Sequence, residues 1–84
     1  MSQMPRFYFD VHEGSTCLRD EAGLVFPNEA AAEKEAAKAA GEMARDLLAD
    51  GDHQEVCIEV RDEGRSPLAA VTVSIEVKRV RRGE

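Results

Sequence analysis

Residues 28–50 read NEAAAEKEAAKAAGEMARDLLAD, and the rest of the domain is built around this stretch. It is dense in Ala, Glu, Lys, Met and Leu, which are strong helix formers, and Asn28 is a good N-cap. Its early acidic residues suit the positive end of the helix dipole. Asp50-Gly51-Asp52 then ends the pattern, because Gly51 suits the left-handed position just beyond a helix. The stretch predicts one long helix that extends through Ala49.

Small and apolar side chains recur along one side of this predicted helix. They follow the three- and four-residue spacing of a buried helical face, and the set is Ala32, Ala36, Ala39, Ala40, Met43 and Leu47. Charged residues fall mostly on the other side. Because this face is made of alanines before Met43, we expect the helix to lie close to a sheet along its first half.

Before the helix, residues 6–12 alternate between apolar and polar side chains, which predicts a half-buried strand. The turn residues 13–15 follow, and residues 16–19 predict a short second strand that forms a hairpin with the first. Residues 24–26 are expected to run extended into Pro27 and to cover the entrance of the helix.

After the helix, residues 55–61 alternate in the same way, and residues 69–77 form the longest predicted strand. The element order strand-strand-helix-strand-strand predicts an α+β, two-layer domain: one antiparallel four-stranded sheet with a single helix packed on one face. The order of the strands does not follow from the sequence. Both an edge position and a central position therefore stay open for residues 69–77.

The composition predicts a single small domain. The chain has 84 residues, which is enough for one hydrophobic core but not for two. We expect an ordered core over residues 4–80 and a frayed tail at residues 81–84. The sequence shows no secretory signal, no disulfide framework and no stretch of roughly 20 apolar residues that would cross a bilayer. A cytoplasmic location is therefore expected.

The charge of the chain bears on its partners. The net charge is -6, which opposes binding to phosphates and fits a basic protein partner better than a nucleic acid. Basic residues gather only near the C-terminus, at Lys78, Arg79, Arg81 and Arg82. We expect this segment to be a solvated terminus, and it is the only support in the sequence for a nucleic-acid-associated role.

The face of the sheet opposite the helix is expected to be open to solvent. Its predicted occupants form the candidate interaction surface: Arg6, Tyr8, Asp10, His12, Glu55, Cys57, Glu59, Arg61, Thr72 and Ser74. Tyr8 is the only aromatic residue among them, which is too few for a base-stacking platform. If residues 69–77 form an edge strand, their unpaired backbone groups offer a second means of association.

The residues that could carry chemistry form no recognisable motif. The four possible zinc ligands lack the close pairs of structural zinc sites, and they are His12, Cys17, His53 and Cys57. A thiol nucleophile or a pair of carboxylates would need a cleft, which a domain of this size rarely offers. The glycines occur singly, so there is no phosphate-binding loop. We expect no catalytic residue, metal or cofactor.

Four groups of residues, taken in order, match a known pattern: MPRFYFD at 4–10, RDEAG at 19–23, the helix residues Ala32, Glu35, Ala36 and Met43-Ala44, and IEVRD at 58–62. In their order and spacing they resemble a family of small domains of unknown function from rhizobia and related alpha-proteobacteria. The likeness covers most of residues 4–80. It implies no activity, ligand or catalytic residue.

At the level of fold alone, the chain is also similar to small antitoxins in which a partial RNase-H-like domain joins a strand hairpin to a helix.

We expect a non-enzymatic protein-interaction module, which binds an unknown protein partner or a second copy of itself through a sheet edge. The alternatives are a nucleic-acid-associated or antitoxin-like regulatory protein, and a small enzyme that uses His12 or Cys57 with nearby acids.

Overall fold

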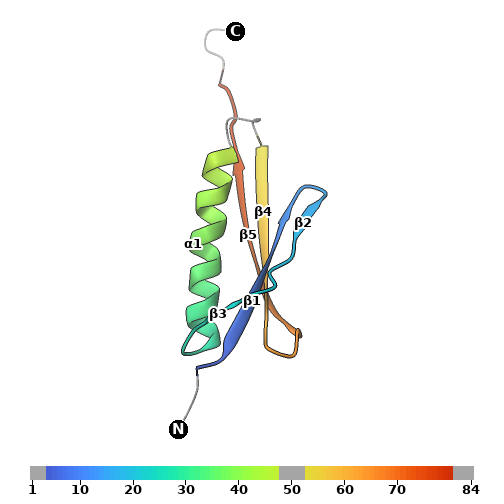
Figure 1. Ribbon diagram of the computed structural model, residues 1–84. Coiled ribbons are helices and arrows are strands. Elements are labelled where there is room, and N and C mark those ends of the chain that lie inside the picture. The colour runs from blue at the N-terminus through green and yellow to red at the C-terminus, as the bar shows by residue number, and fades with distance from the viewer. Residues whose placement is uncertain (1–3, 48–52, 81–84) are drawn as a thin grey trace.

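The computed structural model describes residues 4–47 and 53–80, without the side chains of Leu47, His53 and Gln54 (Figure 1). Its elements are β1 (Arg6–Glu13), β2 (Thr16–Leu18), β3 (Leu24–Val25), α1 (Glu29–Leu47), β4 (His53–Arg61) and β5 (Pro67–Glu76). The predicted α+β class and element order are confirmed. The predictions that the helix extends through Ala49 and ends at Gly51, and those for the tail at residues 81–84, including Arg81 and Arg82, lie outside the described residues.

All strand pairs in the sheet are antiparallel, and the main order is β2-β1-β4-β5. The predicted single antiparallel sheet is confirmed. The short strand β3 is an addition, because the sequence indicated only an extended segment at residues 24–26. Leu24 pairs with Phe7, and the Phe26 N–H donates to the Pro5 carbonyl at 3.1 Å, so this segment joins the outer side of β1.

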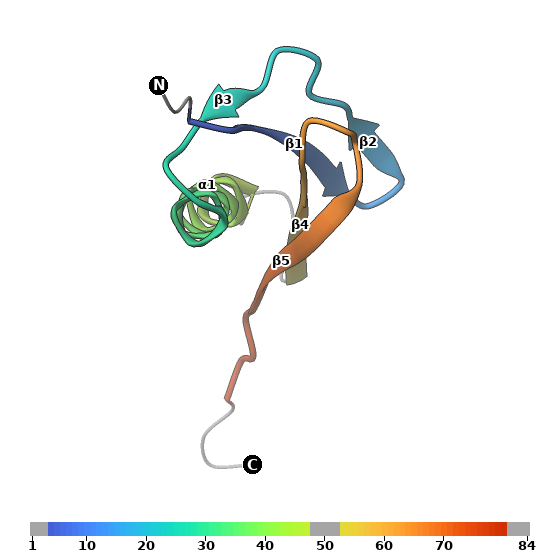
Figure 2. The same ribbon diagram turned by 90° about the horizontal axis from the view of Figure 1, so that it is seen from below.

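Helix α1 packs on β4 and β5 (Figures 1 and 2). Asn28 is confirmed as the N-cap, because its Oδ1 accepts a hydrogen bond from the Ala31 N–H at 2.8 Å. Four alanines, spaced four residues apart, are fully buried against the sheet: Ala32, Ala36, Ala40 and Ala44. The predicted buried face did not include Ala44. Residues spaced four apart wind slowly around a helix, and they all stay buried here because the helix follows a twisted sheet.

The core is small and mostly aliphatic. Val56, Ile58 and Val60 of the central strand β4 are buried beneath the alanines of α1. Phe26 packs on β1, with ring centroids 6.3 Å from Phe7 and 5.8 Å from Phe9. The inward side chains of β5 are only half-buried, namely Ala69, Val71, Val73 and Ile75. The part of the core next to β5 is therefore more accessible to solvent than the part next to β4.

Strand β5 lies at an edge of the sheet and pairs only with β4 in the described part of the chain. The structure thereby settles the question that the sequence left open. The register shifts between Val60 and Arg61, where Leu68 is an extra residue in β5. From Ala69 to Glu76 the pairing is regular. Among the described residues, no helix is long and apolar enough to cross a membrane.

Candidate functional site

The predicted interaction surface falls into two parts on the sheet face opposite α1. Near the β4–β5 turn, polar residues meet in a network: Arg6, Asp10, Glu59 and Arg61 form hydrogen bonds, and the Tyr8 ring lies against the Arg65 guanidinium. Farther along the strands lies a sparser surface with His12, Glu55, Cys57, Thr72 and Ser74. The first part ties the domain together, whereas the second stays accessible, with Glu55, Thr72 and Ser74 exposed.

Asp10 is the centre of the network, and its predicted exposure is wrong because it is only 4% exposed. The guanidinium of Arg61 donates from Nε to Asp10 Oδ2 at 2.7 Å. The backbone N–H of Asp20 donates to Asp10 Oδ1 at 3.0 Å. The chain after β2 and the Arg61 side chain thus cover a position that alternation alone assigned to solvent.

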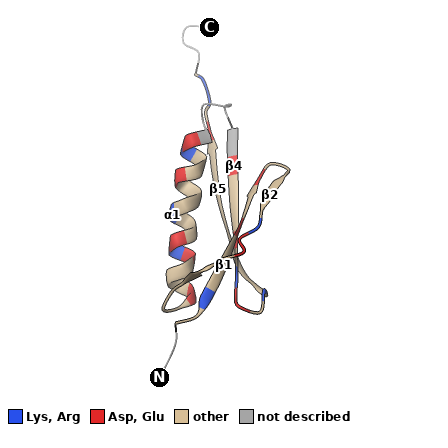
Figure 3. Ribbon diagram, viewed as in Figure 1, with Lys and Arg blue, Asp and Glu red and all other residues tan. Residues whose placement is uncertain are grey.

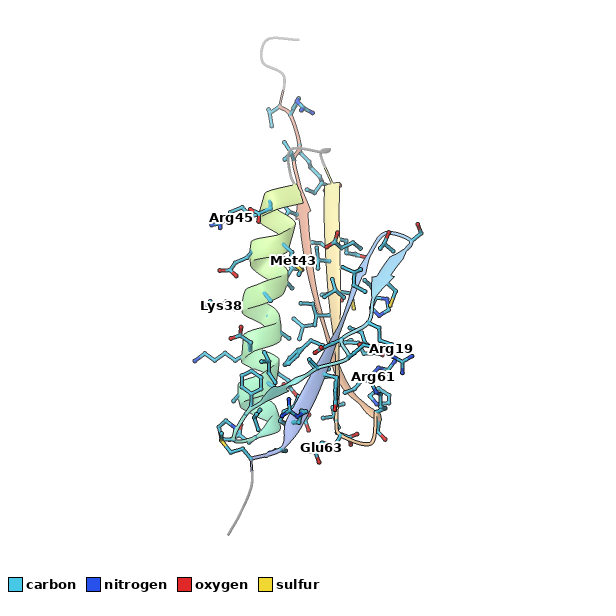
Figure 4. All side chains as sticks on the ribbon, in the orientation of Figure 1. Arg19, Lys38, Met43, Arg45, Arg61 and Glu63 are labelled. Carbon is cyan, nitrogen blue, oxygen red and sulfur yellow. The ribbon has the colours of Figure 1, made fainter. Side chains whose placement is uncertain are left out.

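Arg61, labelled in Figure 4, links three parts of the structure through its hydrogen bonds. Besides Asp10 on β1, it donates to Glu59 Oε1 at 2.5 Å and to the Arg65 carbonyl at 3.0 Å. Each donor nitrogen therefore has a partner. Glu63, in the same turn, accepts a hydrogen bond from the Arg6 N–H at 3.2 Å. The β4–β5 turn is held against the start of β1.

The ionisation of Asp10 is set by burial and by its partners. Burial alone raises the pKa of Asp10, but the Asp20 N–H and the Arg61 guanidinium outweigh it and hold the pKa below its ordinary value. The hydrogen bond to Asp10 raises the pKa of Arg61. The carboxylate is thus ionised at neutral pH and fully paired. This arrangement suits a structural ion pair and does not suit a proton donor.

Asp20 is a second centre of hydrogen bonding, and the sequence did not predict this role. Its Oδ2 accepts from the Phe9 N–H at 3.0 Å, at a point of β1 that neither β2 nor β3 reaches. Its Oδ1 accepts from the N–H groups of Ala22 at 3.1 Å and Gly23 at 3.0 Å. One carboxylate therefore takes the place of a strand at the β1 edge. An Asp-x-x-Gly turn is the sequence signal that could have found it.

Two residues in this region have left-handed backbone conformations. Gly23 has φ 71, and a Cβ atom there would lie 2.8 Å from the Phe7 carbonyl oxygen. Arg65 has φ 67, at a turn position that usually holds glycine. Its guanidinium lies 4.4 Å from the centroid of the Tyr8 ring and donates to the Asp20 carbonyl at 3.2 Å. These contacts compensate the strain at Arg65.

We expect Arg65→Ala to be less stable than Arg65→Gly by about 1 kcal/mol. Both variants lose the contacts with Tyr8 and Asp20, but only alanine keeps the strain of a positive φ. Urea denaturation of the two variants side by side measures this difference. Equal midpoints would show that the backbone at this turn carries no strain.

His12 lies in a row of possible ligands across three strands. It pairs with Cys17 on β2 and with Cys57 on β4, and its Nε2 lies 4.0 Å from the Cys17 Sγ. Both thiols are outside any disulfide. Within the described chain no group of three His, Cys, Asp or Glu side chains is placed to hold a metal ion. The side chain of His53, the fourth residue considered from the sequence, lies outside the described residues.

The outer side of β5, called the β5 edge here, is the longest strand edge without a neighbouring strand in the described structure. Glu76 is the only charged residue of β5 and lies at its end, so most of the strand is tan in Figure 3. Features that protect edges, a proline and a bulge, occur only at Pro67 and Leu68. The remaining eight positions, Ala69 to Glu76, are regular and open to another strand.

Fold and site together define a small α+β domain with a salt-bridged sheet face and one open strand edge. The chain belongs to the family described as a domain of unknown function (DUF6894), whose model matches residues 6–74. Comparison with curated proteins gave no match. Comparison with solved structures gave none either. The predicted membership in a family of unknown function is confirmed, and the family assigns no activity.

Proposed function

We propose that this chain is a non-enzymatic protein-interaction module and that the β5 edge is its binding element. The observation that supports this most is the ten-residue strand at the sheet edge, with one charge at its end. Backbone N–H and C=O groups on such an edge pair readily with an added strand. The half-buried side chains of β5 offer apolar contact beside these hydrogen bonds.

The two edges of the sheet differ in a way that favours this choice. At the β1 edge, β2 and β3 cover both ends of the strand, and Asp20 accepts the Phe9 N–H between them. The β5 edge has no such cover in the described residues. A protein without a need for an open edge would be expected to protect both.

The chemistry of the polar residues supports a binding role over catalysis. Asp10 and Arg61 are committed to each other and to the neighbouring turns. A small enzyme that uses His12 or Cys57 is less well supported, because the hydrogen-bond-range contact between a histidine and a cysteine in the described structure joins His12 to Cys17, at 4.0 Å, and not to Cys57. A nucleic-acid-associated or antitoxin-like role would depend on the basic tail. In this tail the Lys78 Nζ lies 3.8 Å from Glu76 Oε1, so this charge already has an acidic neighbour.

The test is retention of protein partners by an edge variant. Thr72 is exposed in the middle of β5, and Thr72→Lys places a charge there as protected natural edges do. Thr16→Lys, on the exposed strand β2, is the matched control. We expect purified Thr72→Lys to lose the proteins that the wild-type chain retains from native lysate, and Thr16→Lys to keep them. Retention of the same proteins by both variants would contradict the proposal.

We also propose a cytoplasmic location and a family distribution centred on rhizobia and related alpha-proteobacteria. The two cysteines outside any disulfide support the first, since reducing compartments keep thiols unpaired. The sequence resemblance supports the second. Cell fractionation tests the location, and secretion of the chain would contradict it. A genome survey with the family model tests the distribution, and a broad spread over bacteria would contradict it.

A further inference from the structure

We infer that the occupant of the β5 edge is a second copy of this chain, joined through an antiparallel β5–β5 pair with a two-fold axis at Val73. This inference rests on the function proposed above and names its partner. Three features of the described residues support it: the pairing that the sequence of β5 gives with itself, the side of α1 that faces the edge, and a glycine in α1.

A two-fold axis at Val73 gives β5 a compatible partner at each position from Ala69 to Glu76, where the partner of Ala69 is Val77, just after the strand. On the helix side, Val71 meets Ile75 of the second copy, and Ala69 meets Val77. These side chains are half-buried in one chain, except Val77, which is 43% exposed. On the opposite side, Thr72 meets Ser74, a pair that forms hydrogen bonds across strands. Glu76 meets Ala70, so like charges do not face each other.

The side of α1 nearest the β5 edge carries small residues. Figure 2 looks along α1 from its N-terminal end, and a right-handed helix turns clockwise as it recedes. Because Ala36 and Ala40 face the sheet, the residues after them, Ala37 and Gly41, turn toward the β5 side. In the single chain Ala37 is exposed, and Gly41 is half-buried.

When β5 of one chain pairs with β5 of the second copy, the spacing of the joined sheet brings the two α1 helices into contact. Helix α1 packs on both β4 and β5, and neighbouring strands lie about 4.8 Å apart. A helix above the middle of this strand pair lies about 5 Å from the two-fold axis, so the helix axes are about 10 Å apart. Packed helices lie about 8–10 Å apart, and small side chains permit the closer approach.

Gly41 lies at the level of the proposed axis. It follows the start of α1 by about 18 Å, and Val73 follows the start of β5 by about 20 Å, while both elements begin at the same end of the molecule (Figure 1). Glycine is a poor residue for a helix interior. A Cβ atom at Gly41 meets nothing within 4 Å in the single chain, so packing within the described chain does not require glycine. In the proposed dimer, a side chain at this point would face the second helix, and glycine leaves that space open.

The test is the mass of the purified full chain in solution, measured by sedimentation equilibrium at micromolar concentrations. We expect twice the single-chain mass of 9.2 kDa. Gly41→Gln is expected to raise the dissociation constant at least about tenfold without lowering the thermal midpoint of the monomer, because glutamine favours helix more than glycine does. Lys38→Gln, which lies away from the sheet in Figure 4, is the control and should leave the mass unchanged.

Each other outcome overturns a definite part of the inference. A single-chain mass at all concentrations, with partner retention that Thr72→Lys still abolishes, would mean that a different protein occupies the edge, and the proposed function would stand. Assemblies larger than two chains would exclude a closed two-fold pair. A dimer that neither Gly41→Gln nor Thr72→Lys weakens would place the interface elsewhere.

Discussion

Gly23→Ala is expected to lower the free energy of unfolding by about 2–4 kcal/mol. Two costs combine at this position. The backbone has φ 71, which an alanine adopts only under strain, and the new Cβ would lie 2.8 Å from the Phe7 carbonyl oxygen. That oxygen belongs to β1, so the loop between β2 and β3 would have to move away from the strand that it covers. Urea denaturation of the purified variant measures the loss.

Gly14→Ala is the matched control for this effect. Gly14 also has a positive φ, of 58, but a Cβ atom there meets nothing within 4 Å. It should therefore show the backbone strain alone, about 1 kcal/mol. Equal losses in the two variants would mean that the segment around Gly23 does not lie as close to β1 as described.

Asp10→Ala is expected to destabilise the domain by about 2–4 kcal/mol. The substitution removes the buried partner of Arg61 Nε and the acceptor of the Asp20 N–H at once. Glu59→Ala removes only the outer contact of Arg61, with a side chain 28% exposed, and should cost less than about 1 kcal/mol. Similar losses in both variants would contradict the central place given to Asp10.

The same carboxylate gives the domain a dependence on acid. Its pKa in the folded chain lies below the ordinary value, so folding favours the ionised form. The resulting stability is present above the unfolded-state pKa of about 3.9 and is lost as pH falls through the lower folded pKa. Below about pH 5 we expect wild type to lose stability more steeply than Asp10→Asn. Parallel curves from thermal denaturation at each pH would contradict this.

Local patterns were sufficient to predict much of this fold. The alternation in residues 6–12 and 55–61 assigned the buried faces of β1 and β4, and Asn28 marked the start of α1. Strand order depends instead on which hairpins pair over long distances, and no local pattern encodes it. For this reason the sequence could not place β5 at an edge, although it did single out residues 69–77 as a possible edge strand.

The Asp10 network could not be predicted because its members are distant in sequence. Asp10, Asp20 and Arg61 come from β1, the following loop and β4, and only the folded chain brings them together. They belong to the stretches that carry the family resemblance, as does Gly23. In this structure those residues hold the sheet and its loops in place.

Amide hydrogen exchange along β5, resolved by residue in NMR spectra, shows directly whether another strand occupies the β5 edge. In a single chain, every second N–H of β5 points toward β4 and is protected, while those between point outward. An occupied β5 edge protects both sets from Ala69 to Ile75, and we expect this at concentrations where the chain pairs with itself. Rapid exchange of the outward set under those conditions would show that the edge is empty.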